Sequence, residues 1–170
     1  MSISRFVDAC LGVVVGAAIA VVSTAGSFAQ ENASLPAAVI AHPAISVSSL
    51  TIADLRDVLL GERQHWPGGQ RVTVFRPVSG REWEAVLTRV LRLSPLTYDR
   101  RLANKLYAGQ LSNVPRVVAS TTELRRLVAQ TPGGIGIISV AEVDSSVKML
   151  RIDNLLPADP GYPVVSPIER

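Results

Sequence analysis

Short apolar runs alternate with capped helical patterns between residues 37 and 152, and this alternation restricts the possible folds more than any other feature. The runs typical of β-strands are 37–41, 71–75, 116–119, 135–140 and 147–152. The helical patterns lie between them, over residues 50–61, 79–93, 95–108 and 120–130. Strands that alternate with helices predict helical layers packed on a sheet. We therefore expect an α/β fold, a single three-layer α/β/α lobe with a mixed, mostly parallel sheet.

The predicted helices carry local start signals. Three of them begin with a hydroxyl residue and an acidic residue three positions later, which is the spacing of a capping box: Thr51 and Asp54, Ser79 and Glu82, Ser120 and Glu123. The fourth begins with Ser94 as N-cap and Pro95 at the first helical position. On this helix we expect Leu96, Leu102 and Leu106 to face the core.

The first 29 residues have the three parts of a secretory signal peptide. Arg5 gives a positive charge to a short polar head, and an unbroken apolar run follows from Ala9 to Val22. That run is shorter than the roughly 20 residues that a membrane-spanning helix needs. Small residues at Ser27 and Ala29 predict cleavage after Ala29. We therefore expect the mature chain to be periplasmic or secreted; an uncleaved anchor is the alternative.

The chain divides into a signal peptide (1–29), one lobe (30–153) and a proline-rich C-terminal tail (154–170). The lobe is long enough to bury one ordinary hydrophobic core. Cys10 is the only cysteine and leaves with the signal peptide, so the mature chain is expected to have no disulfide and no thiol for catalysis. After cleavage we expect no membrane-spanning segment.

Positive charge is concentrated in the middle of the chain. Residues 56–126 contain 13 basic and 6 acidic residues, a net charge of +7, whereas the whole chain carries +3. Such an excess favours an anionic partner, either an oxyanion, a phosphate-bearing ligand or an anionic surface. An ordinary solvated face is the alternative for most of these arginines.

The predicted strand-to-helix turn over residues 75–81 is the best candidate for a binding site. Ligands of open α/β sheets bind beyond the carboxyl ends of the strands, and a helix start offers free backbone N–H groups to an anion. The turn contains four suitable residues: Arg76, Ser79, Gly80 and Arg81. Arginine side chains can bind an oxyanion through two parallel hydrogen bonds. In the alternative reading Ser79 only caps the helix, and Glu82 competes with an anion for the same helix start.

Catalysis, metal binding and nucleic-acid binding receive little support from the sequence. His42 and His65 are the only histidines, and neither has a partner at the spacing of a zinc site. No catalytic serine elbow, metalloprotease motif or phosphate-binding P-loop is present. Tyr98 and Tyr107 fall on opposite faces of their helix, which argues against a stacking platform for bases. We expect no catalytic residue, no metal and no cofactor, and therefore not an enzyme.

Three segments of the chain resemble the PstS-like, phosphate-binding branch of the periplasmic solute-binding proteins. The first is Ser48–Trp66, with the sequence SSLTIADLRDVLLGERQHW. The second is Val72–Leu91, where a strand leads through RPVSGR into a helix. The third is Val117–Val140, which contains VAS and PGGIG. The likeness as a whole covers about Ala37 to Val140.

This resemblance implies a binding-protein lobe that captures phosphate or a similar oxyanion without catalysis, with an ABC transporter or an envelope protein as its partner. The binding positions it implies are again Arg76, Ser79 and Gly80, together with Arg81, which stands where the family has a small hydroxyl residue. The family's proteins close two lobes around the anion, and this chain has residues for about one. We therefore expect a single-lobe, truncated relative that binds its anion weakly, because one lobe cannot enclose the ligand. The alternative is an envelope protein-interaction module that kept the fold and lost the ligand.

Overall fold

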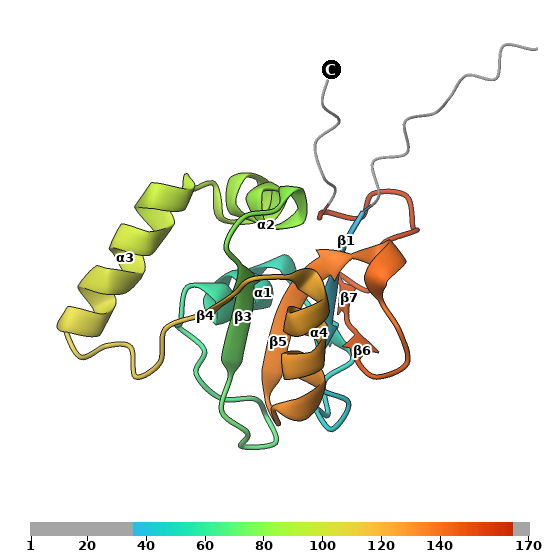
Figure 1. The fold of residues 1–170 in the computed structure, drawn as a ribbon, viewed down its shortest axis with the longest axis horizontal. Helices are drawn as coiled ribbons and strands as arrows, with labels where there is room; N and C mark the ends of the chain where they lie inside the picture. The colour runs from blue at the N-terminus through green and yellow to red at the C-terminus, as the bar shows by residue number, and fades with distance from the viewer. Residues whose placement is uncertain (1–35, 165–170) are drawn as a thin grey trace, which may run out of the picture. The chain divides into compact units, whose positions relative to one another are not determined.

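A five-stranded sheet forms the middle layer of the fold in the computed structural model, which describes residues 36–164 (Figure 1). The predicted signal peptide, and residues 165–170 of the predicted tail, lie outside the described residues. In the order of the sheet the strands are β4 (Arg116–Val118), β3 (Thr73–Pro77), β5 (Gly134–Ser139), β1 (Ala37–Ala41) and β6 (Lys148–Met149). Only β1 runs against the others, because it pairs antiparallel with both β5 and β6. The predicted mixed, mostly parallel sheet is confirmed.

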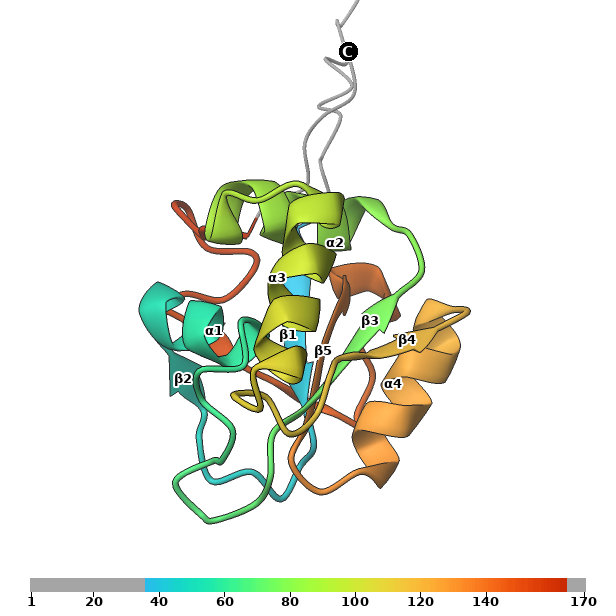
Figure 2. The ribbon, with the colours of Figure 1, turned by 90° about the vertical axis from the view of Figure 1, so that its left-hand side faces the viewer.

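Helices cover both faces of this sheet (Figures 1 and 2). On one side of the sheet lie α1 (Ile52–Leu59), α2 (Arg81–Ala85), the π-helix η1 (Val86–Leu91) and α3 (Pro95–Tyr107), and α3 contacts α2 and the end of α1. The other face packs against α4 (Thr121–Gln130). A 3-10 turn, η2 (Val140–Glu142), follows β5, and a second, two-stranded parallel sheet pairs β2 (Ser49–Leu50) with β7 (Arg151–Ile152). The three-layer arrangement predicted from the sequence is confirmed.

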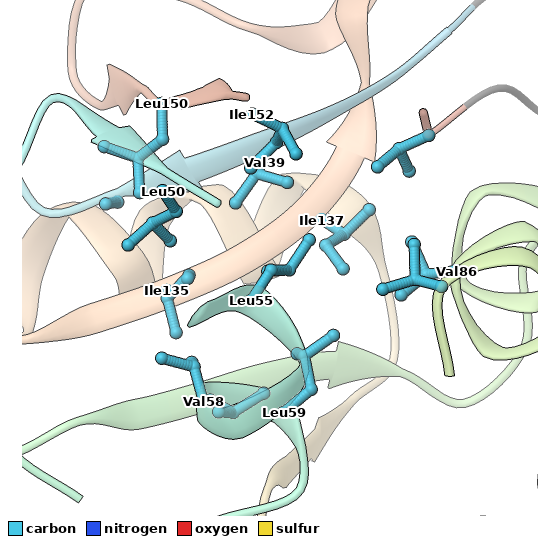
Figure 3. Close-up of a cluster of buried hydrophobic side chains, with 14 of the residues drawn as sticks. Val39, Leu50, Leu55, Val58, Leu59, Val86, Ile135, Ile137, Leu150 and Ile152 are labelled. Carbon is cyan, nitrogen blue, oxygen red and sulfur yellow. The ribbon is translucent and has the colours of Figure 1, made fainter. Parts of the chain in front are cut away.

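The alternation of side chains along the central strands divides the core into two clusters. Ile135 and Ile137 of β5 point into the larger cluster, between the sheet and α1, whereas Ile138 points into the smaller one beneath α4. Figure 3 shows part of the larger cluster. Gly136 faces α4, and a Cβ at this position would lie 2.4 Å from Leu124 Cδ2. The missing side chain therefore lets α4 approach the sheet closely.

The predicted start of α2 is wrong. The sequence pattern places Ser79 at the N-cap with Glu82 in a capping box, but the N-cap is Gly80 and makes no side-chain hydrogen bond. The Gly80 carbonyl accepts the first helical hydrogen bond, from Glu84 N at 3.0 Å. The helix then widens into the π-helix η1 and ends at Arg92 in a left-handed conformation, with φ of 56°. The helix therefore starts one residue later than the capping pattern predicts.

The inward face of α3 also differs from the prediction. Leu102 is buried as expected, but Leu96 is 73% exposed and Leu106 is 45% exposed. Tyr98 takes the central position, fully buried, with its hydroxyl donating to the Leu59 carbonyl at 2.8 Å. Because α3 packs with the Tyr98 face against the end of α1, its leucines at positions 96 and 106 are rotated toward solvent.

The predicted last strand is divided in the structure. Residues 147–152 split into β6 and β7, which belong to different sheets. The described part of the tail packs onto the lobe, because Tyr162 and Val164 are buried and the Val164 carbonyl accepts a hydrogen bond from Ala37 N. Between residues 36 and 164 no helix combines the length and apolar character that crossing a membrane requires.

Candidate functional site

The carboxyl ends of β3, β4 and β5 lie side by side at the same end of the sheet. These strands are parallel, and the register pairs Pro77 of β3 with Val118 of β4. The Val78 N–H donates to the Val118 carbonyl at 3.1 Å, which holds the turn after β3 beside the segment that leads into α4. In Figures 1 and 2, α2 lies beyond this end of β3. The region beyond these carboxyl ends is the expected position for a ligand in an α/β sheet.

Among residues 36–164 there are four α-helices, and the start of α2 differs from the starts of the other three. Side chains of Thr51, Ser94 and Ser120 accept backbone N–H groups at the starts of α1, α3 and α4. At α2 the N-cap Gly80 offers no side chain, and Ser79 is exposed without a hydrogen bond among residues 36–164. Because the first N–H groups of a helix have no partner within it, those of α2 remain available to solvent or to a ligand.

Arg81 is the first residue of α2 and its side chain is exposed. No ion pair involves it among residues 36–164. The next residue, Glu82, places a negative charge near the same helix start, since its Oε2 lies 3.8 Å from the position of a Cβ on Gly80. The turn therefore combines a free guanidinium group and free backbone donors with one carboxylate that opposes anion binding.

Arg76 is directed toward α3. Its Nη2 lies 2.8 Å from Asp99 Oδ1, and its side chain is 17% exposed. The neighbouring Tyr98 fixes this part of α3, because its ring packs edge-on against Trp83 of α2 with a centroid distance of 5.5 Å. Burial raises the pKa of the Tyr98 hydroxyl well above its ordinary value, so the group stays neutral and donates its hydrogen bond.

The structure thus places the predicted site residues in two environments. Ser79, Gly80 and Arg81 lie together at the exposed turn, and Arg76 is paired with Asp99. Asp99 was not identified from the sequence, because its contact with β3 joins residues 23 positions apart and leaves no local pattern. The structure gives no further hydrogen bond that ties Arg76 to the turn.

A small cavity lies at the opposite end of β3 and offers little room for a ligand. Its volume is about 20 Å³, enough for roughly one water molecule. Val58, Leu102 and Leu111 contribute to its apolar wall, and Arg71 stands at its rim, where Nη2 donates to Ser112 Oγ. Residues 36–164 contain no group of three His, Cys, Asp or Glu side chains that could hold a metal ion. His42 instead accepts a hydrogen bond from Ala44 N through Nδ1, at 3.0 Å.

Comparison with known proteins supports the fold. No protein-family model matches the chain. PstS from Borrelia burgdorferi superposes with a TM-score of 0.61 and 18% identity, over 77% of this chain and 54% of that protein. A second match is a Clostridium perfringens protein assigned provisionally as a phosphate ABC transporter substrate-binding protein and solved with bound phosphate. Its TM-score is 0.57 and its sequence identity is 22%, over 72% of this chain and 46% of that protein. An ABC-type phosphate transport receptor from Vibrio cholerae has a TM-score of 0.51 and 19% identity, over 72% of this chain and 48% of that protein.

These identities are low enough that the likeness establishes the fold alone. The chain spans about half the length of the solved structures it matches. The fold expected from the PstS-like segments is therefore confirmed, and the chain shares with the PstS-type phosphate-binding proteins the fold of about half of their length.

Proposed function

We propose that the chain is a noncatalytic binding domain for phosphate or a similar oxyanion, with Arg76, Ser79, Gly80 and Arg81 as its binding residues. The observation that carries this proposal is the start of α2, which is the one α-helix start without a side-chain cap among residues 36–164. An exposed arginine stands at its first position. Three elements of an anion site, free amides, an accessible hydroxyl and a guanidinium group, thus lie within three consecutive residues.

The chemistry of these groups suits an oxyanion. Backbone N–H groups at a helix start point outward and carry partial positive charge. Gly80 has no side chain to keep a ligand from the backbone, and Arg81 can donate two parallel hydrogen bonds to the oxygens of one phosphate. The Ser79 hydroxyl adds a donor that can rotate toward the ligand.

The exposure of this turn favours weak binding. Tight capture needs donors on several sides and exclusion of water, which strengthens each electrostatic contact. Here the donors come from one turn, and Glu82 lies beside them. We therefore expect a dissociation constant on the order of 1 mM, equivalent to about 4 kcal/mol of binding free energy.

The cellular setting is part of the same proposal. Residues 1–29 act as a cleaved signal peptide, residues 30–153 form the binding lobe and residues 154–170 form the tail. The lobe works in the periplasm or outside the cell, as an accessory to phosphate transport that contacts an ABC transporter or another envelope protein. This role is supported by the phosphate-transport proteins whose fold it shares.

A second candidate function, an envelope protein-interaction module, is favoured by the outer face of α3. Leu96 is 73% exposed and Tyr107 is 89% exposed, and both lie opposite the buried Tyr98. Exposed arginines at positions 100 and 101 accompany them. Large apolar side chains on a basic helix face are typical of surfaces that bind a partner. This module would keep its role without any bound anion.

Thermal melting in phosphate tests the first function against the second. With a dissociation constant of about 1 mM, 10 mM phosphate stabilises the folded protein by about 1.4 kcal/mol, or about 4 °C for a domain of this size. Sodium chloride at the same ionic strength should give no comparable increase. Arg81→Ala should remove most of the phosphate effect, and Arg126→Ala, which removes an exposed arginine from α4, should retain it. Equal melting temperatures in phosphate and chloride would reject oxyanion binding and leave the interaction module.

A further inference from the structure

A shallow groove runs along the outer side of α3, which lies at the margin of the lobe in Figure 1. Its volume is about 580 Å³, and six side chains that can donate hydrogen bonds line it: Thr97, Arg100, Arg101, Asn104, Lys105 and Gln110. Along the helix the groove extends from Thr97 to Ala108, which is about 16 Å at the rise of an α-helix. Such a lining favours an occupant that is rich in hydrogen-bond acceptors.

The groove carries an excess of positive charge. Lys105 forms an ion pair with Glu62 and donates to the Leu60 carbonyl at 3.0 Å, so its charge is already compensated. In the part of the chain that the structure describes, Arg100 and Arg101 are exposed and form no ion pair. The three cations and Glu62 therefore leave a net charge of +2, which is complementary to carboxylates.

We propose that this groove binds an acidic segment of a partner protein, in which two carboxylates lie between apolar residues. The inference rests on the second candidate function, the interaction module, and names the chemistry of its partner. A segment of about five residues in extended form spans the length of the groove. Arg100 and Arg101 can each bind one carboxylate through two parallel hydrogen bonds. Leu96 and Tyr107, at the two ends of α3, lie within about 40° of Arg100 around the helix and offer apolar contacts to the ends of the segment.

Two other occupants fit this surface less well. A second copy of the chain that docks through the same face would place its own Arg100 and Arg101 against those of the first, and like charges repel each other. A bilayer surface is flat and reaches only the rim of a hollow, whereas an extended chain can lie inside it. The shape and the charge of the groove together favour a protein segment.

An NMR titration of the full chain with a synthetic peptide tests the inference. The probe is a pentapeptide with blocked termini, leucine at both ends and glutamate at the second and fourth positions. At low ionic strength we expect the backbone amide signals of residues 96–110 to shift and saturate, and the same peptide with glutamine in place of glutamate to leave them unchanged. In the double variant Arg100→Gln/Arg101→Gln, binding should be about five- to thirty-fold weaker, the range expected when two exposed ion pairs of good geometry are lost.

A matched control separates this effect from a general change in charge. Arg126→Gln/Arg151→Gln also removes two exposed arginines, from α4 and β7, and should weaken peptide binding less than two-fold. If the wild type does not bind the glutamate peptide, or binds it no better than Arg100→Gln/Arg101→Gln does, the inference is refuted. Phosphatidylglycerol vesicles that bind the wild type better than this double variant, without any binding of the peptide, would overturn it in favour of a membrane surface. Arg100→Gln/Arg101→Gln should keep the phosphate-dependent melting of the wild type, so oxyanion binding stands or falls separately.

Discussion

Tyr98 anchors α3 to the rest of the lobe, and removing only its hydroxyl group gives a sharp test of how that helix is held. The hydroxyl is buried and donates to the Leu59 carbonyl at 2.8 Å near the end of α1. Tyr98→Phe deletes this donor and keeps the ring contact with Trp83. The Leu59 carbonyl then loses its partner in a buried position. A buried group left without its hydrogen bond costs about 1–2 kcal/mol.

The same substitution at Tyr107 is the matched control. Tyr107 lies on the same helix and is 89% exposed, so Tyr107→Phe should change the free energy of unfolding by less than about 0.5 kcal/mol. Urea unfolding followed by circular dichroism measures both variants. We expect Tyr98→Phe to lower the free energy of unfolding by about 1.5 kcal/mol with an unchanged m-value, and to lower the melting temperature by about 5 °C. Equal stabilities of the two variants would refute the packing described for α3.

Two further predictions concern the packing of α4 and the cap of α1. Gly136→Ala should destabilise the protein by about 1–3 kcal/mol in urea unfolding, because the new methyl group would meet Leu124 Cδ2 at 2.4 Å; a variant as stable as the wild type would show that α4 sits farther from the sheet. Hydrogen bonds from Thr51 hold the pKa of Asp54 below its ordinary value of 3.8, so its contribution to stability is present above that pH and is lost as the pH falls through the lowered pKa. Asp54→Asn should therefore lower the free energy of unfolding by about 1 kcal/mol at pH 7, and its stability should fall less steeply than that of the wild type below pH 4. Parallel acid unfolding curves for the two proteins would contradict this.

Elements with purely local signals were predicted well from the sequence. The strand Ala37–Ala41 has the predicted bounds, and Thr51, Ser94 and Ser120 cap their helices as expected. Each of these signals involves residues within one turn of each other, so the rest of the fold has little influence on it. The alternation of such elements then predicted the layered architecture correctly.

The sequence-based predictions failed at the start of α2 and on the inward face of α3. Ser79 has the spacing of a cap, yet the helix begins at Gly80. Leu96 lies six positions before Leu102, about 120° away around the helix, so the two cannot share one inward face. Tyr98, four positions before Leu102, is buried instead, where it packs against Trp83 and reaches the Leu59 carbonyl. The contact of Asp99 with Arg76 depends on the same packing, and for this reason it became visible only in the structure.

The central claim is that the start of α2 binds an oxyanion, and an NMR titration with inorganic phosphate tests it most directly. At constant ionic strength the backbone amide signals of residues 79–83 should shift progressively and saturate in the millimolar range. The amides of residues 121–123, at the start of α4 that Ser120 caps, provide an internal control and should stay in place. In Arg81→Ala the shifts should be largely lost. Amide signals of residues 79–83 that do not move, or that move no more than those at the start of α4, would contradict the account.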